Sequence, residues 1–106
     1  MGTAEIESAI VSHPSVAEAA AIALPHDLKG NAIHGFVILK HGLVASAELE
    51  IQIKNHVAKM MGPIAKPESI TFVDALPKTR SGKIMRRVLK ARALGEDEGD
   101  LSTLAD

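Results

Sequence analysis

Cysteine, tryptophan and tyrosine are absent from this chain, and phenylalanine occurs only at Phe36 and Phe72. The lack of cysteine excludes a disulfide framework and a thiolate zinc site, and it agrees with a reducing, cytoplasmic compartment. At 2% aromatic residues, stacking platforms for bases or sugars are essentially missing. The core therefore has to be built from aliphatic side chains.

Long apolar runs are missing as well. No stretch approaches the roughly 18 apolar residues of a membrane-spanning helix, and the N-terminus lacks the pattern of a signal peptide, so we expect no membrane contact. The 106 residues, 46% hydrophobic and 24% charged, fit one small globular domain. At this size folding hides only about 60 to 65% of the chain's surface, so a deep catalytic pocket competes with the core for side chains. A complete enzyme is not expected.

The first half of the sequence predicts one helix followed by two strands. The helix begins at Thr3, whose hydroxyl is a suitable cap, and ends before Pro14. Its buried face is expected to hold Ile6, Ala9 and Ile10. The run 16–24, VAEAAAIAL, is ambiguous because alanine favours a helix, but its length and its end at Pro25 favour a buried strand. A second strand is expected over 33–40.

The second half predicts a helix, a strand and a helix. Apolar residues recur at helical spacing after Ser46, at Leu49, Ile53, Val57 and Met60. Gly62 is expected to end that helix, 69–73 to form a short third strand, and a last helix to run from about Ile84 to Leu94, ended by Gly95. The fold class is α/β (α+β): a small three-stranded sheet packed with about three helices, in the order αββαβα.

The C-terminal residues 96–106 differ in composition from the rest. They contain five acidic residues and no basic one, with too few apolar residues for a core, and we expect them to form a flexible acidic tail. The predicted domain is therefore 1–95, which carries twelve bases and eight acids.

Positive charge is concentrated between residues 77 and 92. Seven of the twelve bases lie there, without any acid: Lys78, Arg80, Lys83, Arg86, Arg87, Lys90 and Arg92. The last four are interpreted as a solvated helix face. The first three surround a Ser-Gly turn before a helix start, where cations are unfavourable and an incoming phosphate or carboxylate is favoured. A chance surface cluster is the alternative.

Other chemistries have little support. A phosphate-binding P-loop needs glycine at 77 and a hydroxyl at 84, where the chain has Pro77 and Ile84. The near-neutral total charge and the lack of aromatic residues argue against a nucleic-acid binder. The five histidines are dispersed, so no metal site is predicted. Glu5 and Glu7 point to different faces of a helix, form no acid/base pair and are assigned to solvent.

Four stretches together carry a resemblance to a known family. They are AEIESAIVSHPSVAEAA (4–20), GPIAKPESI (62–70), PKTRSGKIMRRVL (77–89) and GDLSTLAD (99–106). In this order they resemble the C-terminal domain of adenylate-forming enzymes, and AMP-forming acetyl-CoA synthetases in particular. The resemblance covers nearly the whole chain.

The resemblance implies a mobile domain that works with a larger N-terminal adenylation domain, where ATP, Mg²⁺ and the acid bind. In one orientation acetyl-AMP forms, and in the other CoA attacks it. By position Lys83 is the implied catalytic lysine, in a loop with Thr79, Arg80, Ser81 and Gly82. It is also the implied target of a protein lysine acetyltransferase and a deacetylase. The domain alone is expected to be inactive and to hold no cofactor.

Two departures from the family pattern follow. The family's hinge residue and a glycine of its pantetheine tunnel should precede residue 2, so the start of the chain indicates a piece of something longer. Many relatives carry an arginine that meets the CoA 3′-phosphate where this chain has Ala58, and the next residue, Lys59, is the candidate substitute. The alternative function is a free-standing anion-binding or interaction module that uses the basic segment 78–92.

Overall fold

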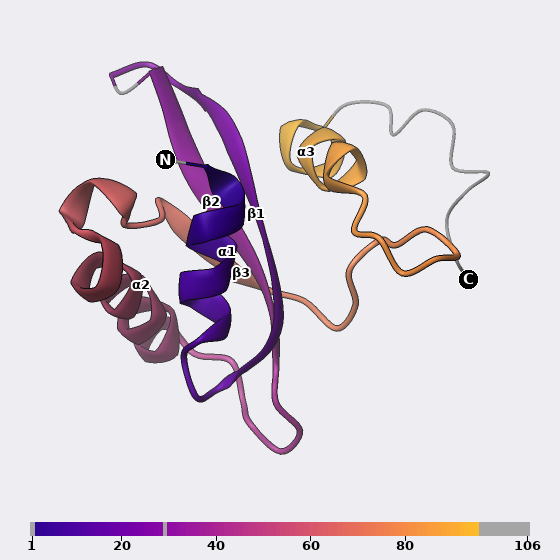
Figure 1. Cartoon of the computed structure of the whole chain (residues 1–106), viewed down its shortest axis with the longest axis horizontal. Coiled ribbons are helices and arrows are strands. Elements are labelled where there is room, and N and C mark those ends of the chain that lie inside the picture. Colours follow the sequence, from indigo (N-terminus) through magenta and orange to yellow (C-terminus); the bar gives the residue numbers. More distant parts are fainter. Residues whose placement is uncertain (1, 29, 96–106) are drawn as a thin grey trace.

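The computed structural model describes residues 2–28 and 30–95 (Figure 1). The elements are α1 (Thr3–Val11), β1 (Val16–His26), β2 (Gly30–Leu39), α2 (Ala47–Met61), the short 3₁₀ helix η1 (Pro63–Ala65), β3 (Ser69–Phe72) and α3 (Arg86–Leu94). This order confirms the predicted αββαβα arrangement and adds one 3₁₀ turn after α2. The expected tail, 96–106, lies outside the described residues.

The three strands form one mixed sheet in the order β1-β2-β3. Strands β1 and β2 are antiparallel neighbours, whereas β3 pairs in parallel with β2, with His34 opposite Ser69 and Val37 opposite Phe72. Parallel neighbours cannot be joined by a tight turn, and α2 with η1 supplies the crossover. The sheet therefore has β1 and β3 as its open edges.

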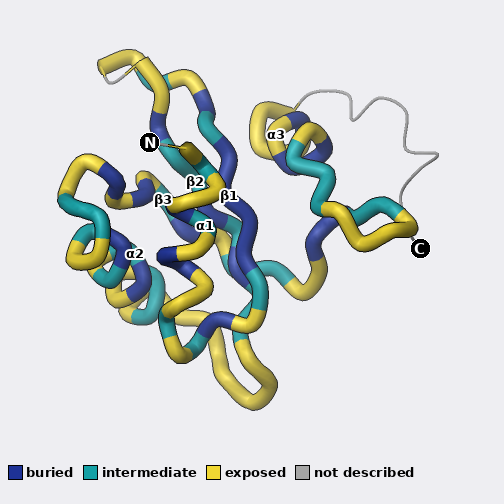
Figure 2. The backbone as a smooth tube through the Cα atoms, viewed as in Figure 1, coloured by how far each residue is buried: buried dark blue, intermediate teal, exposed yellow. Residues whose placement is uncertain are grey.

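The two faces of the sheet are covered by different parts of the chain. Helices α1 and α2 pack on one face in a cluster of Ile6, Ala9, Ile10, Val16, Ala19, Ala21, Val37, Ile53, Val57, Ala65 and Ile70. Ala20, Ile22 and Leu24 face the other side, where they meet Leu76 and Leu89. Strand β1 is thus buried on both faces (Figure 2), which explains why its sequence is apolar without alternation.

Strand β1 continues through Pro25, although the sequence predicts that this proline ends it. Pro25 lies opposite Asn31, and pairing extends to His26 and Gly30. Ala21 donates its N–H away from β2, to Oε2 of Glu7 at 2.8 Å. Because strand N–H groups alternate in direction, the nitrogen of Pro25 also faces the open edge, where a missing N–H breaks no sheet hydrogen bond.

Two details of the helices also differ from expectation. Thr3 is not a cap: Gly2 occupies the N-cap position of α1, without a side-chain hydrogen bond. Met60 is 56% exposed, and Met61 instead extends the apolar face of α2 against the core. The last helix starts at Arg86 rather than near Ile84, and it ends as predicted at Gly95, whose φ is 70°.

Glutamates from the two main helices bond to the open sheet edges. Glu7 accepts from the N–H of Ala21 in β1, and Oε2 of Glu50 accepts from the N–H of Ile70 in β3 at 2.9 Å. The hydrogen bond from Ile70, together with Lys54 at 3.3 Å, lowers the pKa of the Glu50 carboxyl. Each edge therefore has at least one backbone donor satisfied from within the domain.

Among residues 2–28 and 30–95, no helix combines the length and apolar character that crossing a lipid bilayer requires.

Substituting Gly35 in the centre of β2 is expected to destabilise the domain. A Cβ at this position would lie 2.7 Å from Cδ1 of Ile70 and 3.2 Å from Cδ1 of Ile10, and both side chains are buried. For Gly35→Val we expect a loss of about 1 to 3 kcal/mol in the free energy of unfolding, measured by urea denaturation. Ala17→Val, at an exposed β1 position, is the control. Equal stability of the two variants would contradict the packing described for Gly35.

Candidate functional site

Residues 78–84 form a tight hairpin between β3 and α3. Lys78 and Ile84 pair as an isolated antiparallel bridge. Inside it the N–H of Thr79 donates to the carbonyl of Lys83 at 2.8 Å, and the N–H of Gly82 donates to the carbonyl of Thr79 at 2.9 Å. Gly82 has a φ of +90°, which side-chain-bearing residues rarely adopt, so the sharp turn depends on glycine here.

The hydroxyls of the 78–84 hairpin bond within it. Oγ1 of Thr79 accepts from the backbone N–H of Lys83 at 3.1 Å and lies 2.9 Å from Oγ of Ser81. These contacts hold the backbone on either side of the turn. Thr79 and Ser81 therefore shape the loop in which Lys83 lies.

Lys83 projects from the hairpin as an exposed residue. Its backbone takes part in the turn, while its ammonium has no ion pair or hydrogen bond within residues 2–28 and 30–95. Arg80, at the tip of the turn, is exposed too. The hairpin thus presents a cation that is not neutralised by a carboxylate of the described chain.

Lys78 differs from Lys83, although the sequence groups them with Arg80 as cations awaiting an anion. The ammonium of Lys78 donates to Oε1 of Glu18 in β1, and both side chains are partly exposed. Its charge is compensated internally. The interpretation that Lys78 attracts an incoming ligand is therefore wrong.

Arg86 is not only solvated, as the sequence suggests: its side chain is 40% exposed but forms an ion pair. Its Nε donates to Oε2 of Glu7 at 2.7 Å, and Nη2 donates to Oε1 of the same carboxylate. The side chain of Glu7 is only 13% exposed, so its assignment to solvent is also wrong. Hydrogen bonding to Glu7 raises the pKa of Arg86 above its usual value, against the opposing effect of burial.

Lys59 lies apart from the hairpin. It is an exposed residue in the last turn of α2, which packs on the sheet face opposite to the one that contacts Leu76 and Leu89 (Figure 1). The structure therefore does not bring the two candidate lysines, Lys59 and Lys83, into one site.

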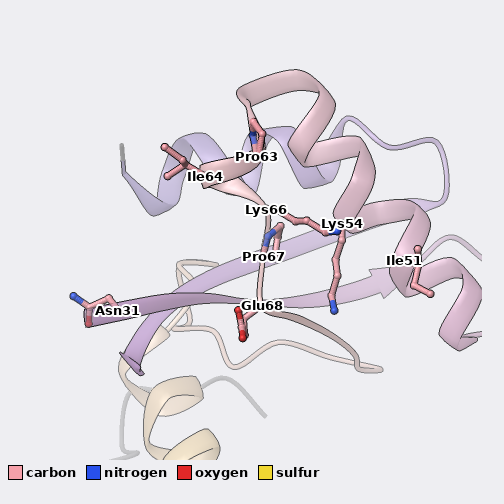
Figure 3. Close-up of a pocket in the computed structure, with 8 residues that line it drawn as sticks. All are labelled: Asn31, Ile51, Lys54, Pro63, Ile64, Lys66, Pro67 and Glu68. Atoms are coloured by element: carbon pink, nitrogen blue, oxygen red, sulfur yellow. The ribbon is translucent and has the colours of Figure 1, made fainter. Parts of the chain in front are cut away.

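A hollow of about 680 Å³ lies between α2, η1 and the start of β2 (Figure 3). It is lined by Asn31, Ile51, Lys54, Pro63, Ile64, Lys66, Pro67 and Glu68. It contains none of the site residues predicted from the sequence. Within the described part of the chain, no three side chains of His, Cys, Asp or Glu come together as a possible metal site.

The sequence pattern of one protein family matches residues 5–83 of this chain: the AMP-binding enzyme C-terminal domain. The chain belongs to this family. The match spans both helices and the sheet of the main core, and its last residue is Lys83. The family membership confirms the resemblance seen in the sequence to the C-terminal domain of adenylate-forming enzymes.

Individual relatives are acyl-CoA synthetases. The chain is 58% identical over 106 residues to 3-hydroxypropionyl-coenzyme A synthetase of Metallosphaera sedula, and 56% identical over 108 residues to acetyl-coenzyme A synthetase of Cronobacter sakazakii. All of the chain is covered in both cases, but it spans only 16% and 17% of the length of these two relatives.

Solved structures share the fold. The acyl-CoA synthetase of Brucella canis superposes with a TM-score of 0.86 at 38% identity, covering 90% of this chain and 18% of that protein. The ATP-bound MatB of Rhodopseudomonas palustris gives a TM-score of 0.75 at 29% identity, over 85% of this chain and 17% of that protein.

The hairpin geometry predicts different reactivities for two neighbouring lysines. Under limited acylation with a small amine-reactive ester, Lys83 should react faster than Lys78. The ammonium of Lys78 is held in an ion pair, whereas that of Lys83 has no ion pair with any residue that the structure describes. Quantitative mass spectrometry of the modified peptides measures both. Glu18→Gln should raise the reactivity of Lys78 and leave Lys83 unchanged. Equal reaction of the two lysines in the unmodified sequence would contradict the assigned pairing.

Proposed function

We propose that this chain acts as the C-terminal domain of an AMP-forming acyl-CoA synthetase, with Lys83 as the cation of the adenylation half-reaction. The observation that carries the proposal is the exposed ammonium of Lys83, which has no ion pair or hydrogen bond with residues 2–28 or 30–95, on a tight hairpin whose base is attached to the sheet. The family match over residues 5–83 supports the same assignment.

In the proposed reaction a carboxylate oxygen of the acid attacks the α-phosphorus of ATP, the bond to the pyrophosphate oxygen breaks, and acyl-AMP forms. Negative charge is shared between carboxylate and α-phosphate as they join. An ammonium placed beside both stabilises this arrangement more than it stabilises the separated reactants. Lysine suits this task because it carries a compact charge on a long stem.

The remaining steps are assigned to the larger adenylation domain and to the thioester half-reaction, in which the thiol of CoA displaces AMP. ATP and its Mg²⁺ would bind to the larger domain. For CoA we propose a contact between Lys59 and the terminal phosphate. Because Lys59 and Lys83 lie over opposite faces of the sheet, two orientations of the domain would present them in turn.

Acetate is proposed as the acid, because several relatives at 54 to 56% identity are named acetyl-coenzyme A synthetase. The relative from Metallosphaera sedula makes 3-hydroxypropionate the second candidate. Both are short carboxylic acids, and the role of Lys83 is the same for either.

Replacing Lys83 should abolish most of the adenylation activity. We would insert the full 106-residue chain in place of the matching segment of the Cronobacter sakazakii enzyme and measure acid-dependent pyrophosphate exchange. Lys83→Ala should lower the rate by about 10² to 10³, as for the loss of one charged group that stabilises a transition state. Lys90→Ala, which removes an exposed lysine from α3, is the matched control and should stay near the parent rate.

A near-normal exchange rate for Lys83→Ala would refute the proposed role. If the inserted chain gives no activity but binds phosphate or RNA tightly without the larger domain, the alternative of a free-standing anion-binding module is favoured instead.

We further propose that Lys83 is a target of regulatory acetylation. Acetylation removes the positive charge and so should stop acyl-AMP formation while leaving the thioester half-reaction active. The exposed hairpin is open to a protein lysine acetyltransferase and to the deacetylase that reverses its action. The test is treatment with such an acetyltransferase followed by mass spectrometry. Modification of other lysines with Lys83 left untouched would count against this proposal.

A further inference from the structure

Two ion pairs attach the base of the 78–84 hairpin to the N-terminal part of the domain. Lys78, at the start of the hairpin, binds Glu18 in β1. Arg86, two residues after its end, binds Glu7 in α1 through two nitrogens. The partners are 60 and 79 residues apart in sequence, so both pairs are products of the tertiary fold. We call these two pairs the hairpin clamp.

The Glu7–Arg86 pair is the more constrained half of the clamp. Both oxygens of Glu7 accept from Arg86, and Oε2 also accepts from the N–H of Ala21 at 2.8 Å. A carboxylate and a guanidinium joined through two parallel hydrogen bonds fix each other's direction as well as their distance. The start of α3 is thereby oriented relative to both α1 and β1.

Apolar contacts support the same region without reaching its tip. Leu76, before the hairpin, and Leu89, after it, are buried against Ile22 and Leu24 of β1. The residues 80–83 are all exposed. The chain is therefore packed against β1 both before and after the hairpin. Lys83 lies on the exposed, hydrogen-bonded turn between these two contacts.

We propose that the hairpin clamp is a positioning device for adenylation: Glu18–Lys78 and Glu7–Arg86 set the direction of the hairpin, and hence the place at which Lys83 meets the reacting groups. This inference rests on the proposed function of Lys83. Neither ion pair touches substrate in this scheme, so its members act through the lysine they orient.

The physical reason is that a single charge stabilises a transition state only when it arrives in the correct geometry. A displacement of about 1 Å caused by a change away from the chemistry can cost about 10² in rate. Loss of a clamp pair should therefore lower kcat of adenylation, because the lysine contact is made in the transition state, and should leave KM for the acid and ATP nearly unchanged.

Charge exchange in the more exposed pair tests the proposal, in the same enzyme that carries the full chain. Glu18→Lys and Lys78→Glu should each lower kcat of pyrophosphate exchange by about 10-fold, with KM within about twofold of the parent. The double variant restores an ion pair in reversed order and should recover most of the lost rate. Thioester formation from supplied acyl-AMP should not change in any of the three.

A neutral variant and a conservative variant distinguish a positioning effect from a loss of folding. Glu18→Gln removes the ion pair without adding a repelling charge, and it should lower kcat of pyrophosphate exchange as Glu18→Lys does. Arg86→Lys keeps the charge but loses the two-nitrogen contact, so it should lower kcat while the unfolding midpoint shows that the domain is folded. A purely structural role would move the unfolding midpoint and both half-reactions together.

The outcomes separate this inference from the proposed function. If Lys83→Ala loses about 10²-fold or more and the clamp variants retain full adenylation, the positioning proposal is overturned and the role of Lys83 stands. The positioning proposal also fails if the double exchange is as slow as the product of the single losses. If Lys83→Ala itself is fully active, the proposed function fails first and the clamp has no lysine to position.

Discussion

The carboxylate of Glu7 joins three parts of the chain that are distant in sequence. It lies on α1, accepts the outward N–H of Ala21 in β1, and receives two hydrogen bonds from Arg86 at the start of α3. With 13% of its side chain exposed, this carboxylate would be costly to hold in its charged form without such partners. Glu7 therefore helps to fix the orientation of α3 relative to the sheet, together with the Lys78–Glu18 pair and the buried Leu76 and Leu89.

The two faces of the sheet are covered by different segments of the chain. One face is covered by α1 and α2 and forms most of the core, while the other is covered by the shorter segment that contains the hairpin. Strand β1 contributes to the core on both faces, because its residues alternate between the two clusters. Ala19 and Ala21 lie in the cluster with α1 and α2, and Ala20 and Ile22 lie in the cluster with Leu76 and Leu89. The hairpin is therefore mounted directly on the most buried strand, which is a rigid support for a side chain that has to be placed accurately.

Sequence periodicity is sufficient for the element order, the buried face of α1, the buried face of α2 apart from Met60, and the end of α3 at Gly95, because these depend on neighbours in the chain. It fails where tertiary contacts decide. Glu7 is assigned to solvent and Arg86 to a surface face because nothing in the local sequence indicates a partner 79 residues away. Pro25 is expected to end β1 because the sequence does not reveal the edge position of that strand. Lys83 is exposed, and its catalytic role stays a prediction.

The two edge strands, β1 and β3, determine whether the sheet can pair with the sheet of another copy. A strand from another chain would need the outward N–H groups of β1 or β3 to extend the ladder. At Ala21 and Ile70 these donors are occupied by carboxylates, and at Pro25 there is no donor at all. Edge-to-edge association at these positions would have to displace a glutamate or leave an acceptor unsatisfied, so Glu7, which also contacts the start of α3, disfavours the pairing of β1 with a strand of another copy.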